Sequence, residues 1–132
     1  MVSIVIVSHS HLLAQGLKQL AIEMSRENVK IATAGGLDEI TIGTNAERIY
    51  QAIQEVYTSD GVLILFDLGG ALFSTQMAIE MLPLERQKKV KLSGAPIVEG
   101  TLVATVEASL GHDLEKVNSA AEAAQHAEKI LL

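Results

Sequence analysis

The sequence of 132 residues contains no cysteine. This absence excludes a disulfide framework, a thiolate zinc site, an iron–sulfur cluster and a thiol nucleophile, and it fits a reducing cytoplasm. Basic residues are also few, because 10 Lys and Arg stand against 16 Asp and Glu and give a formal net charge of −6. A protein that binds nucleic-acid phosphates needs a surface rich in Lys and Arg. The acidic balance therefore argues against nucleic acid as a partner.

Long apolar runs are missing as well. The longest uninterrupted run, Val62 to Phe66, has five residues, whereas a membrane-spanning helix needs about 20. The segment Met1–Val5 has no basic region and does not read as a secretory signal. With 48% apolar residues, the chain is long enough for a core of its own but too short for two ordinary domains. We expect one cytoplasmic domain over residues 1–132, with no membrane contact.

Short apolar runs alternate with stretches of helical periodicity. The runs expected to form strands are Val2–Val7, Val29–Ala34, Gly61–Phe66 and Val90–Leu92. The first expected helix is Leu12–Met24, and its apolar face contains Leu13, Leu17, Leu20 and Met24. The second begins at a Thr44–Glu47 capping box, and one of its faces contains Ile49, Ile53 and Val56. The others are Ala71–Leu82, stopped by Pro83; a helix bearing Leu102, Val106 and Leu110, ended by Gly111; and one from Asp113 to Ile130.

This alternation predicts an α/β fold with right-handed βαβ units, in which helices cover both faces of an open, mostly parallel four-stranded sheet. In such sheets ligands bind beyond the carboxyl ends of the strands, at the point where the strand order reverses. If the order is 2-1-3-4, the reversal falls between the first and third strands. His9 and Asp67 come directly after those two strands. We therefore expect an imidazole and a carboxylate to meet in a crevice there.

His9 and Asp67 together are suited to carry a phosphoryl group on histidine. A neutral imidazole has a free lone pair and can act as a nucleophile. A carboxylate that accepts the Nδ1–H would fix the tautomer, direct Nε2 outward and stabilise the cation formed on attack. Backbone N–H groups and hydroxyls at two helix N-termini could bind the phosphoryl oxygens. These candidate phosphate-stabilising residues are Ser10, Gly69, Gly70, Ala71 and Ser74.

Plainer interpretations of the same residues stay open. A histidine after a strand is commonly a hydrogen-bonded loop residue, and an aspartate before Gly-Gly is commonly a turn residue. The pair His9 and His11 could suggest a metal, but without cysteine only Asp67 offers a third ligand, so we expect no metal. The sequence has neither a G-x-G-x-x-G nor a Walker lysine motif. We expect His112 and His126 to lie on the solvated surface.

Three segments, read together, resemble a known family. They are Val5–Ser10, Asp67–Leu72 and Ala95–Thr101. In order and spacing they are similar to the mannose-type IIA (EIIA) domains of the bacterial phosphoenolpyruvate-dependent phosphotransferase system, most of all to the branch that serves dihydroxyacetone kinase. The resemblance implies a parallel sheet of order 2-1-3-4 and usually a homodimer. It also implies that His9 carries phosphate on Nε2 and that Asp67 orients the ring.

The resemblance further implies which partners exchange the phosphate. The donor would be the small histidine-containing phosphocarrier protein, HPr. The acceptor would be ADP on the nucleotide-binding subunit of the kinase, and the regenerated ATP would phosphorylate dihydroxyacetone on a third subunit. ADP, ATP and Mg²⁺ would then belong to the partner, and this chain would bind no cofactor. Some members fuse this domain to carrier and enzyme I-like domains, whereas we expect this chain to need a separate donor.

One sequence difference distinguishes the sugar-transporting branch of this family from the dihydroxyacetone branch. The sugar-transporting branch typically has Ser/Thr-Pro after the Gly-Gly turn, whereas Ala71–Ser74 follows here, which favours the dihydroxyacetone branch. The EIIA component of a mannose-type sugar transporter stays open as an alternative, as does a non-catalytic, receiver-like binding module. Receiver domains hold Mg²⁺ with acidic residues after the first strand, and Ser8–Ser10 contains none.

Overall fold

A computed structural model of the chain describes residues 1–25 and 29–130. Its centre is a four-stranded sheet of order β2-β1-β3-β4, in which every neighbouring pair is parallel. The strands are β1 (Ser3–Ser8), β2 (Ile31–Gly35), β3 (Val62–Phe66) and β4 (Val90–Leu92). The predicted strand order and the parallel arrangement are confirmed.

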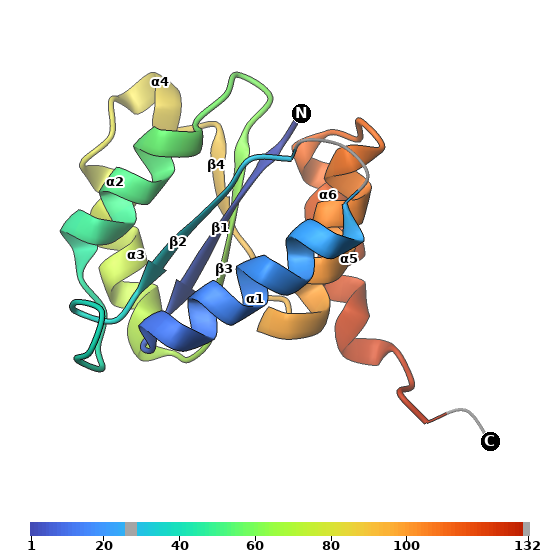
Figure 1. The fold of residues 1–132 in the computed structure, drawn as a ribbon. Helices are drawn as coiled ribbons and strands as arrows, with labels where there is room; N and C mark the ends of the chain where they lie inside the picture. Colours follow the sequence, from blue (N-terminus) through green and yellow to red (C-terminus); the bar gives the residue numbers. More distant parts are fainter. Residues whose placement is uncertain (26–28, 131–132) are drawn as a thin grey trace.

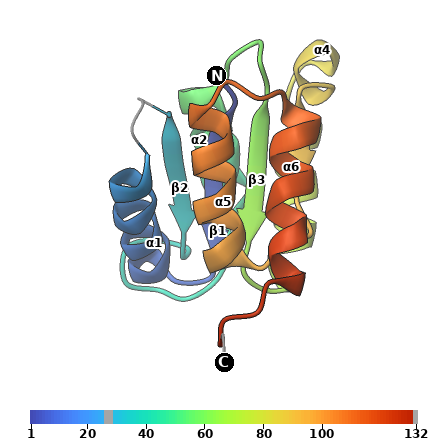
Figure 2. The same cartoon turned by 90° about the vertical axis from the view of Figure 1, so that its right-hand side faces the viewer.

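Helices cover both faces of this sheet, as Figure 1 shows from the side and Figure 2 from the face that carries α1, α5 and α6. They are α1 (His11–Met24), α2 (Ala46–Val56), α3 (Gly70–Glu80), α4 (Leu84–Gln87), α5 (Ile97–Ser109), α6 (Leu114–Ala123) and the 3₁₀ turn η1 (Ala124–His126). The opposite face is covered by α2 and α3. Among the described residues, no helix has the length and apolar character needed to cross a membrane.

The two faces of the central strand β1 contribute to separate cores. Ile4 and Ile6 pack with side chains of α1, α5 and α6, whereas Val5 and Val7 pack with side chains of α2 and α3. All four side chains are fully buried. Because alternate residues of a strand point to opposite faces, a strand covered on both sides needs apolar residues at every position. This requirement explains why Ile4–Val7 of β1 is an unbroken apolar run.

The predicted apolar face of α1 was wrong in part. Leu17 is buried, but it is accompanied by Ala14 and Ala21, while Leu13, Leu20 and Met24 are 43–51% exposed. The reason is a close approach between α1 and the end of β2. A Cβ atom placed on Gly35 would lie 2.7 Å from the Cα of His11 and 2.9 Å from the Cβ of Ala14. Only small side chains fit where the elements are this close, so Leu13 and Leu20 lie at the flanks.

A close approach also shapes α5, the helix that was expected to bear Leu102, Val106 and Leu110. The residues of α5 that are buried are all small: Gly100, Thr101, Ala104, Thr105 and Ala108. Leu110 is 65% exposed, and Leu102 and Val106 are half-buried. A Cβ on Gly100 would lie 2.5 Å from the Cβ of Ala95. The helix does end before Gly111, which has a φ of 83°, as predicted.

Several other boundaries differ from the predictions, although Ile49, Ile53 and Val56 are buried in α2 as expected. Asn45, not Thr44, is the N-cap of α2, because its Oδ1 accepts from the N–H groups of Glu47 and Arg48. The strands β2 and β3 begin at Ile31 and Val62, and α3 ends at Glu80. The short helix α4, after Pro83, was not predicted.

The last helix is shorter than the sequence pattern indicated. Asp113 is its N-cap, as predicted, and accepts from the N–H of Lys116 at 2.9 Å. However, α6 ends at Ala123 and not at Ile130. Side chains from Gln125 to Ile130 are exposed. Without a face to bury, helical propensity alone does not sustain a short helix in water.

Candidate functional site

His9 and Asp67 lie next to each other because they follow paired strands. His9 comes after the last residue of β1, and Asp67 comes after Phe66, whose Cα is paired with that of Val7. The Nδ1 atom of His9 lies 2.9 Å from Oδ1 of Asp67. The predicted meeting of imidazole and carboxylate at the carboxyl ends of β1 and β3 is therefore confirmed.

This contact determines which nitrogen of His9 is free. An ionised carboxylate only accepts hydrogen bonds, so the ring hydrogen lies on Nδ1 and, in the neutral ring, Nε2 keeps its lone pair. Nε2 faces Gly70, where an added Cβ would be 3.1 Å away. The side chain of His9 is 25% exposed and that of Asp67 is 11% exposed. A visiting molecule can thus reach the ring, while the carboxylate behind it is largely covered.

Both carboxylate oxygens of Asp67 accept hydrogen bonds. Oδ2 accepts from the backbone N–H of His9 at 3.0 Å and from the hydroxyl of Ser8 at 2.9 Å. Oδ1 accepts from the N–H of Leu68 at 2.7 Å in addition to the imidazole. Burial raises the pKa of Asp67, but these hydrogen bonds outweigh it and hold the pKa below its usual value. Asp67 is therefore a fixed anion behind the ring.

The N-terminus of α3 lies beside Nε2 through Gly70. Among the hydrogen bonds of residues 1–25 and 29–130, none uses the N–H of Gly69 or Gly70, as is usual for the first turn of a helix. The N–H of Ala71 already donates to the carbonyl oxygen of Leu68 at 3.0 Å. Of the three predicted backbone donors, Gly69 and Gly70 are thus the ones available to an anion.

The two predicted hydroxyl donors have local roles. Ser10 is the N-cap of α1, and its Oγ accepts from the N–H of Leu13 at 3.2 Å. The Oγ of Ser74 lies 2.7 Å from Oγ1 of Thr44, which belongs to the loop between β2 and α2. That both could also donate to a phosphoryl oxygen stays a prediction.

Besides the N–H of Leu68, sequence reasoning missed two residues that contact this pair. One is Ser8, the buried last residue of β1, whose hydroxyl reaches Asp67. The other is Gly43, whose N–H donates to the carbonyl oxygen of His9 at 2.9 Å. A serine that follows the apolar run Ile4–Val7 and directly precedes His9 was a usable signal for the first. No local pattern indicated the second, because the loop before α2 reaches His9 only in the folded chain.

The other histidines lie apart from the pair. His11, in the first turn of α1, is half-buried. The side chain of His112 is 32% exposed, with Nε2 3.4 Å from Oε2 of Glu107, so it is only partly solvated. His126 is exposed as expected. Within the described part of the chain, no three His, Asp or Glu side chains gather as metal ligands would.

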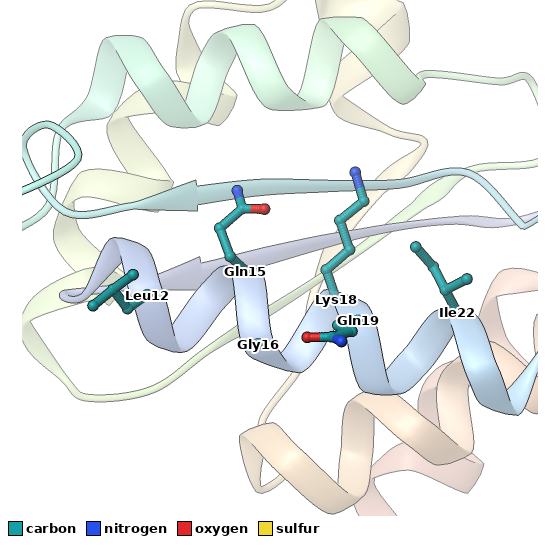
Figure 3. A pocket seen from close by; sticks show the side chains of 6 residues that line it. All are labelled: Leu12, Gln15, Gly16, Lys18, Gln19 and Ile22. Carbon is teal, nitrogen blue, oxygen red and sulfur yellow. The ribbon is translucent and has the colours of Figure 1, made fainter.

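An open groove along α1 is a second surface feature, shown in Figure 3. It is lined by Leu12, Gln15, Gly16, Lys18, Gln19 and Ile22. Gln15 donates to the hydroxyl oxygen of Thr33 on β2 at 2.8 Å. The lining contains one charged side chain and neither His9 nor Asp67. The candidate site is therefore the strand-end pair and not this groove.

Comparisons with known proteins show which family the chain belongs to. Residues 3–118 match the EIIA-man family, described as the PTS system fructose IIA component. The chain is 47% identical over 120 residues to the phosphoryl donor subunit DhaM of PEP-dependent dihydroxyacetone kinase from Escherichia coli K12, covering 89% of this chain and 25% of that protein. It thus spans about a quarter of the length of this relative.

Two further proteins match over nearly their whole length. The phosphoryl donor subunit DhaM of PEP-dependent dihydroxyacetone kinase 2 from Listeria innocua is 35% identical over 117 residues, which cover 89% of this chain and 94% of that protein. The solved structure of the protein EF1359 is 31% identical, covers 92% of both chains and superposes with a TM-score of 0.80. Because the family model matches residues 3–118, the chain belongs to the EIIA-man family of phosphotransferase-system IIA components.

Proposed function

We propose that this chain is a phosphohistidine carrier that receives a phosphoryl group on Nε2 of His9 from HPr. It passes the group to ADP held by the nucleotide-binding subunit of dihydroxyacetone kinase. The observation that carries this proposal is the 2.9 Å contact between Nδ1 of His9 and Oδ1 of Asp67, together with the partial exposure of the ring. The two DhaM relatives are phosphoryl donor subunits of dihydroxyacetone kinases, which supports the choice of acceptor.

The first transfer is a displacement at phosphorus. The lone pair of Nε2 attacks the phosphorus of the donor's phosphohistidine, the P–N bond of the donor breaks, and the donor nitrogen keeps the electron pair. His9 becomes a phosphorylated imidazolium whose Nδ1–H still donates to Asp67. The carboxylate stabilises this positive charge, as in the hydrolase triad.

The second transfer reverses this change on His9. A terminal oxygen of ADP attacks the phosphorus, the P–N bond to Nε2 breaks, and the ring returns to its neutral form. The N–H groups of Gly69 and Gly70 stabilise the phosphoryl oxygens, and the hydroxyls of Ser10 and Ser74 donate further hydrogen bonds. The N–H of Ala71 contributes as well once it releases the carbonyl oxygen of Leu68. Mg²⁺ and the nucleotide belong to the acceptor subunit, and this chain holds no cofactor.

The exchange takes place in the cytoplasm between proteins that dock in turn. The chain acts as a homodimer, which sedimentation equilibrium would test directly. Its formal charge of −6 favours encounter with partners that present basic surfaces.

The decisive experiment combines the protein with phosphoenolpyruvate, enzyme I and HPr. We expect an acid-labile, alkali-stable adduct of about 80 Da, the mass of one transferred phosphoryl group, on His9. Two-dimensional NMR should place the phosphorus on Nε2, since Nδ1 is occupied by Asp67. A His9→Ala variant should take up no phosphate, whereas the control His126→Ala, at an exposed position, should behave as wild type. An adduct that persists in His9→Ala would exclude the carrier.

A second step identifies the acceptor. The phosphorylated protein is mixed with the nucleotide-binding subunit of dihydroxyacetone kinase and ADP, and ATP is measured. ATP formation supports the proposed acceptor. Phosphate that stays on His9 here but moves to a IIB component of a mannose-type transporter would support the sugar-transport alternative instead.

A further inference from the structure

Ser8 occupies a position from which it cannot touch a visiting phosphoryl group. It is the last residue of β1 and its side chain is fully buried. Its backbone is fixed by the sheet, where its Cα is paired with that of Gly35 on β2. Any contribution that Ser8 makes to the chemistry must therefore pass through another residue.

The hydroxyl of Ser8 has two hydrogen bonds, and both lie in the site. It donates to Oδ2 of Asp67 at 2.9 Å and accepts from the N–H of Ser10 at 3.0 Å. Because an ionised carboxylate only accepts, the hydroxyl hydrogen is directed to Oδ2, and the N–H of Ser10 uses one of the hydroxyl lone pairs. Ser8 thus connects the start of α1 to the anion behind His9.

The two oxygens of Asp67 have different surroundings. Oδ1 contacts the imidazole and accepts from the N–H of Leu68, while Oδ2 accepts from the backbone N–H of His9 and the hydroxyl of Ser8. The terminal torsion of an aspartate is broad and roughly two-fold, so it is not fixed by the side chain itself. The backbone N–H groups of Leu68 and His9 hold one oxygen each, and the hydroxyl of Ser8 is the one side-chain donor among the described residues that adds to them on Oδ2 and keeps Oδ1 directed at Nδ1.

We propose that Ser8 is a positioning residue for phosphoryl transfer, acting by orienting the carboxylate of Asp67 and, through it, the tautomer of His9. This inference rests on the proposed function of His9 as the phosphoryl carrier. In the absence of the hydroxyl, the carboxylate turns more freely, a larger share of the neutral imidazole carries its hydrogen on Nε2, and that share cannot attack phosphorus.

The test compares Ser8→Thr with Ser8→Val. These two variants have nearly the same shape, and both side chains suit a β-strand, but only threonine keeps the hydroxyl. Ser8→Ala extends the comparison. The matched control is Ser3→Ala, because Ser3 is also buried on β1 and its hydroxyl has no hydrogen bond to the described residues. Two readouts are measured, the ¹⁵N NMR spectrum of the His9 ring and the rate of phosphate uptake from phosphorylated HPr.

We expect Ser8→Val and Ser8→Ala to take up phosphate about tenfold more slowly, in line with the loss of a hydrogen bond to a charged group. The ring spectrum should show an increased fraction protonated on Nε2. Ser8→Thr and Ser3→Ala should match wild type in both readouts. A wild-type tautomer ratio in Ser8→Val, or the same defect in Ser3→Ala, would overturn the proposal.

The two proposals fail in distinguishable ways. If wild-type protein takes up no phosphate but Ser8→Val shifts the tautomer ratio, the positioning role stands and the carrier function is excluded. If wild type takes up phosphate and Ser8→Val does so at the same rate, the carrier function stands and the positioning role is excluded.

Discussion

The N–H of Gly43 donates to the carbonyl oxygen of His9 at 2.9 Å, so the loop between β2 and α2 is tied directly to the candidate site. Gly43 has a φ of 142°, and an added Cβ would lie 2.8 Å from the side chain of Leu37. Glycine adopts this backbone conformation freely, whereas other residues adopt it at a cost. The hydrogen bond to His9 therefore depends on the absence of a side chain at position 43.

Replacing Gly43 with alanine should shift this loop and disturb His9. We expect Gly43→Ala to lower the free energy of unfolding by about 1 kcal/mol and to slow phosphate uptake. The control is Gly111→Ala, which introduces alanine at a φ of 83° with none of the described atoms within 4 Å of the new Cβ. It should destabilise the protein comparably while leaving the uptake rate unchanged. Equal uptake rates in both variants would show that the loop does not influence His9.

Removal of the Asp67 carboxylate should affect transfer more than stability. We expect Asp67→Ala to reduce phosphate uptake by about a hundredfold, because the ring loses the acceptor that fixes its tautomer and balances its charge. The melting temperature should fall by only a few degrees. Asp60→Ala removes an exposed carboxylate that pairs with the N-terminus and should leave the rate unchanged. A collapsed melting temperature with normal residual transfer would mean that Asp67 is merely structural.

The lowered pKa of Asp67 also predicts how stability depends on pH. A carboxyl whose folded-state pKa lies below its unfolded value contributes stability that is present above the unfolded pKa, about 3.9. This contribution is lost as the pH falls through the folded-state pKa. The difference in unfolding free energy between wild type and Asp67→Asn should therefore shrink as the pH is lowered from 5 towards 2, measured by urea denaturation. A difference that stays constant across this range would contradict a lowered pKa of Asp67 in the folded protein.

The small residues on α5 should tolerate no enlargement. Gly100→Ala places a Cβ 2.5 Å from that of Ala95, and we expect it to cost about 1–3 kcal/mol in unfolding free energy. Gly16, in the interior of α1, is a matched helical control, since none of the described atoms lies within 4 Å of its added Cβ. Gly16→Ala should stabilise the protein by about 0.5–1 kcal/mol. Thermal denaturation of both variants tests this contrast, and a neutral Gly100→Ala would show that α5 can move away from its neighbours.

The sequence was sufficient to predict the sheet and the central pair of the site. The apolar strands, the alternation with helices and the positions of His9 and Asp67 after two of the strands all follow from local patterns, and parallel strands bring their carboxyl ends to one edge. Local patterns do not contain the strand order. The order 2-1-3-4 was a hypothesis, and the structure confirms it.

Helix faces were harder to predict, because they depend on how closely elements approach. In α1 and α5 the residues in contact with the core are mostly small, and the bulky Leu13 and Leu110 lie outside. Hydrophobic periodicity emphasises large side chains, so it misses a face that is selected for close packing. The contacts of Ser8 and Gly43 in the site were missed for a related reason, since both are made across the tertiary structure.

His9 extends from the end of β1, a strand with a hydrogen-bonded neighbour on each side. The proposed nucleophile is therefore anchored to a central strand of the sheet rather than to a closing lid. A carrier built in this way presents the imidazole in the same position to the donor and to the acceptor. Any adjustment needed to bring phosphorus into line must then be made by the donor and the acceptor, which would restrict the choice of partners to proteins able to fit a rigid surface.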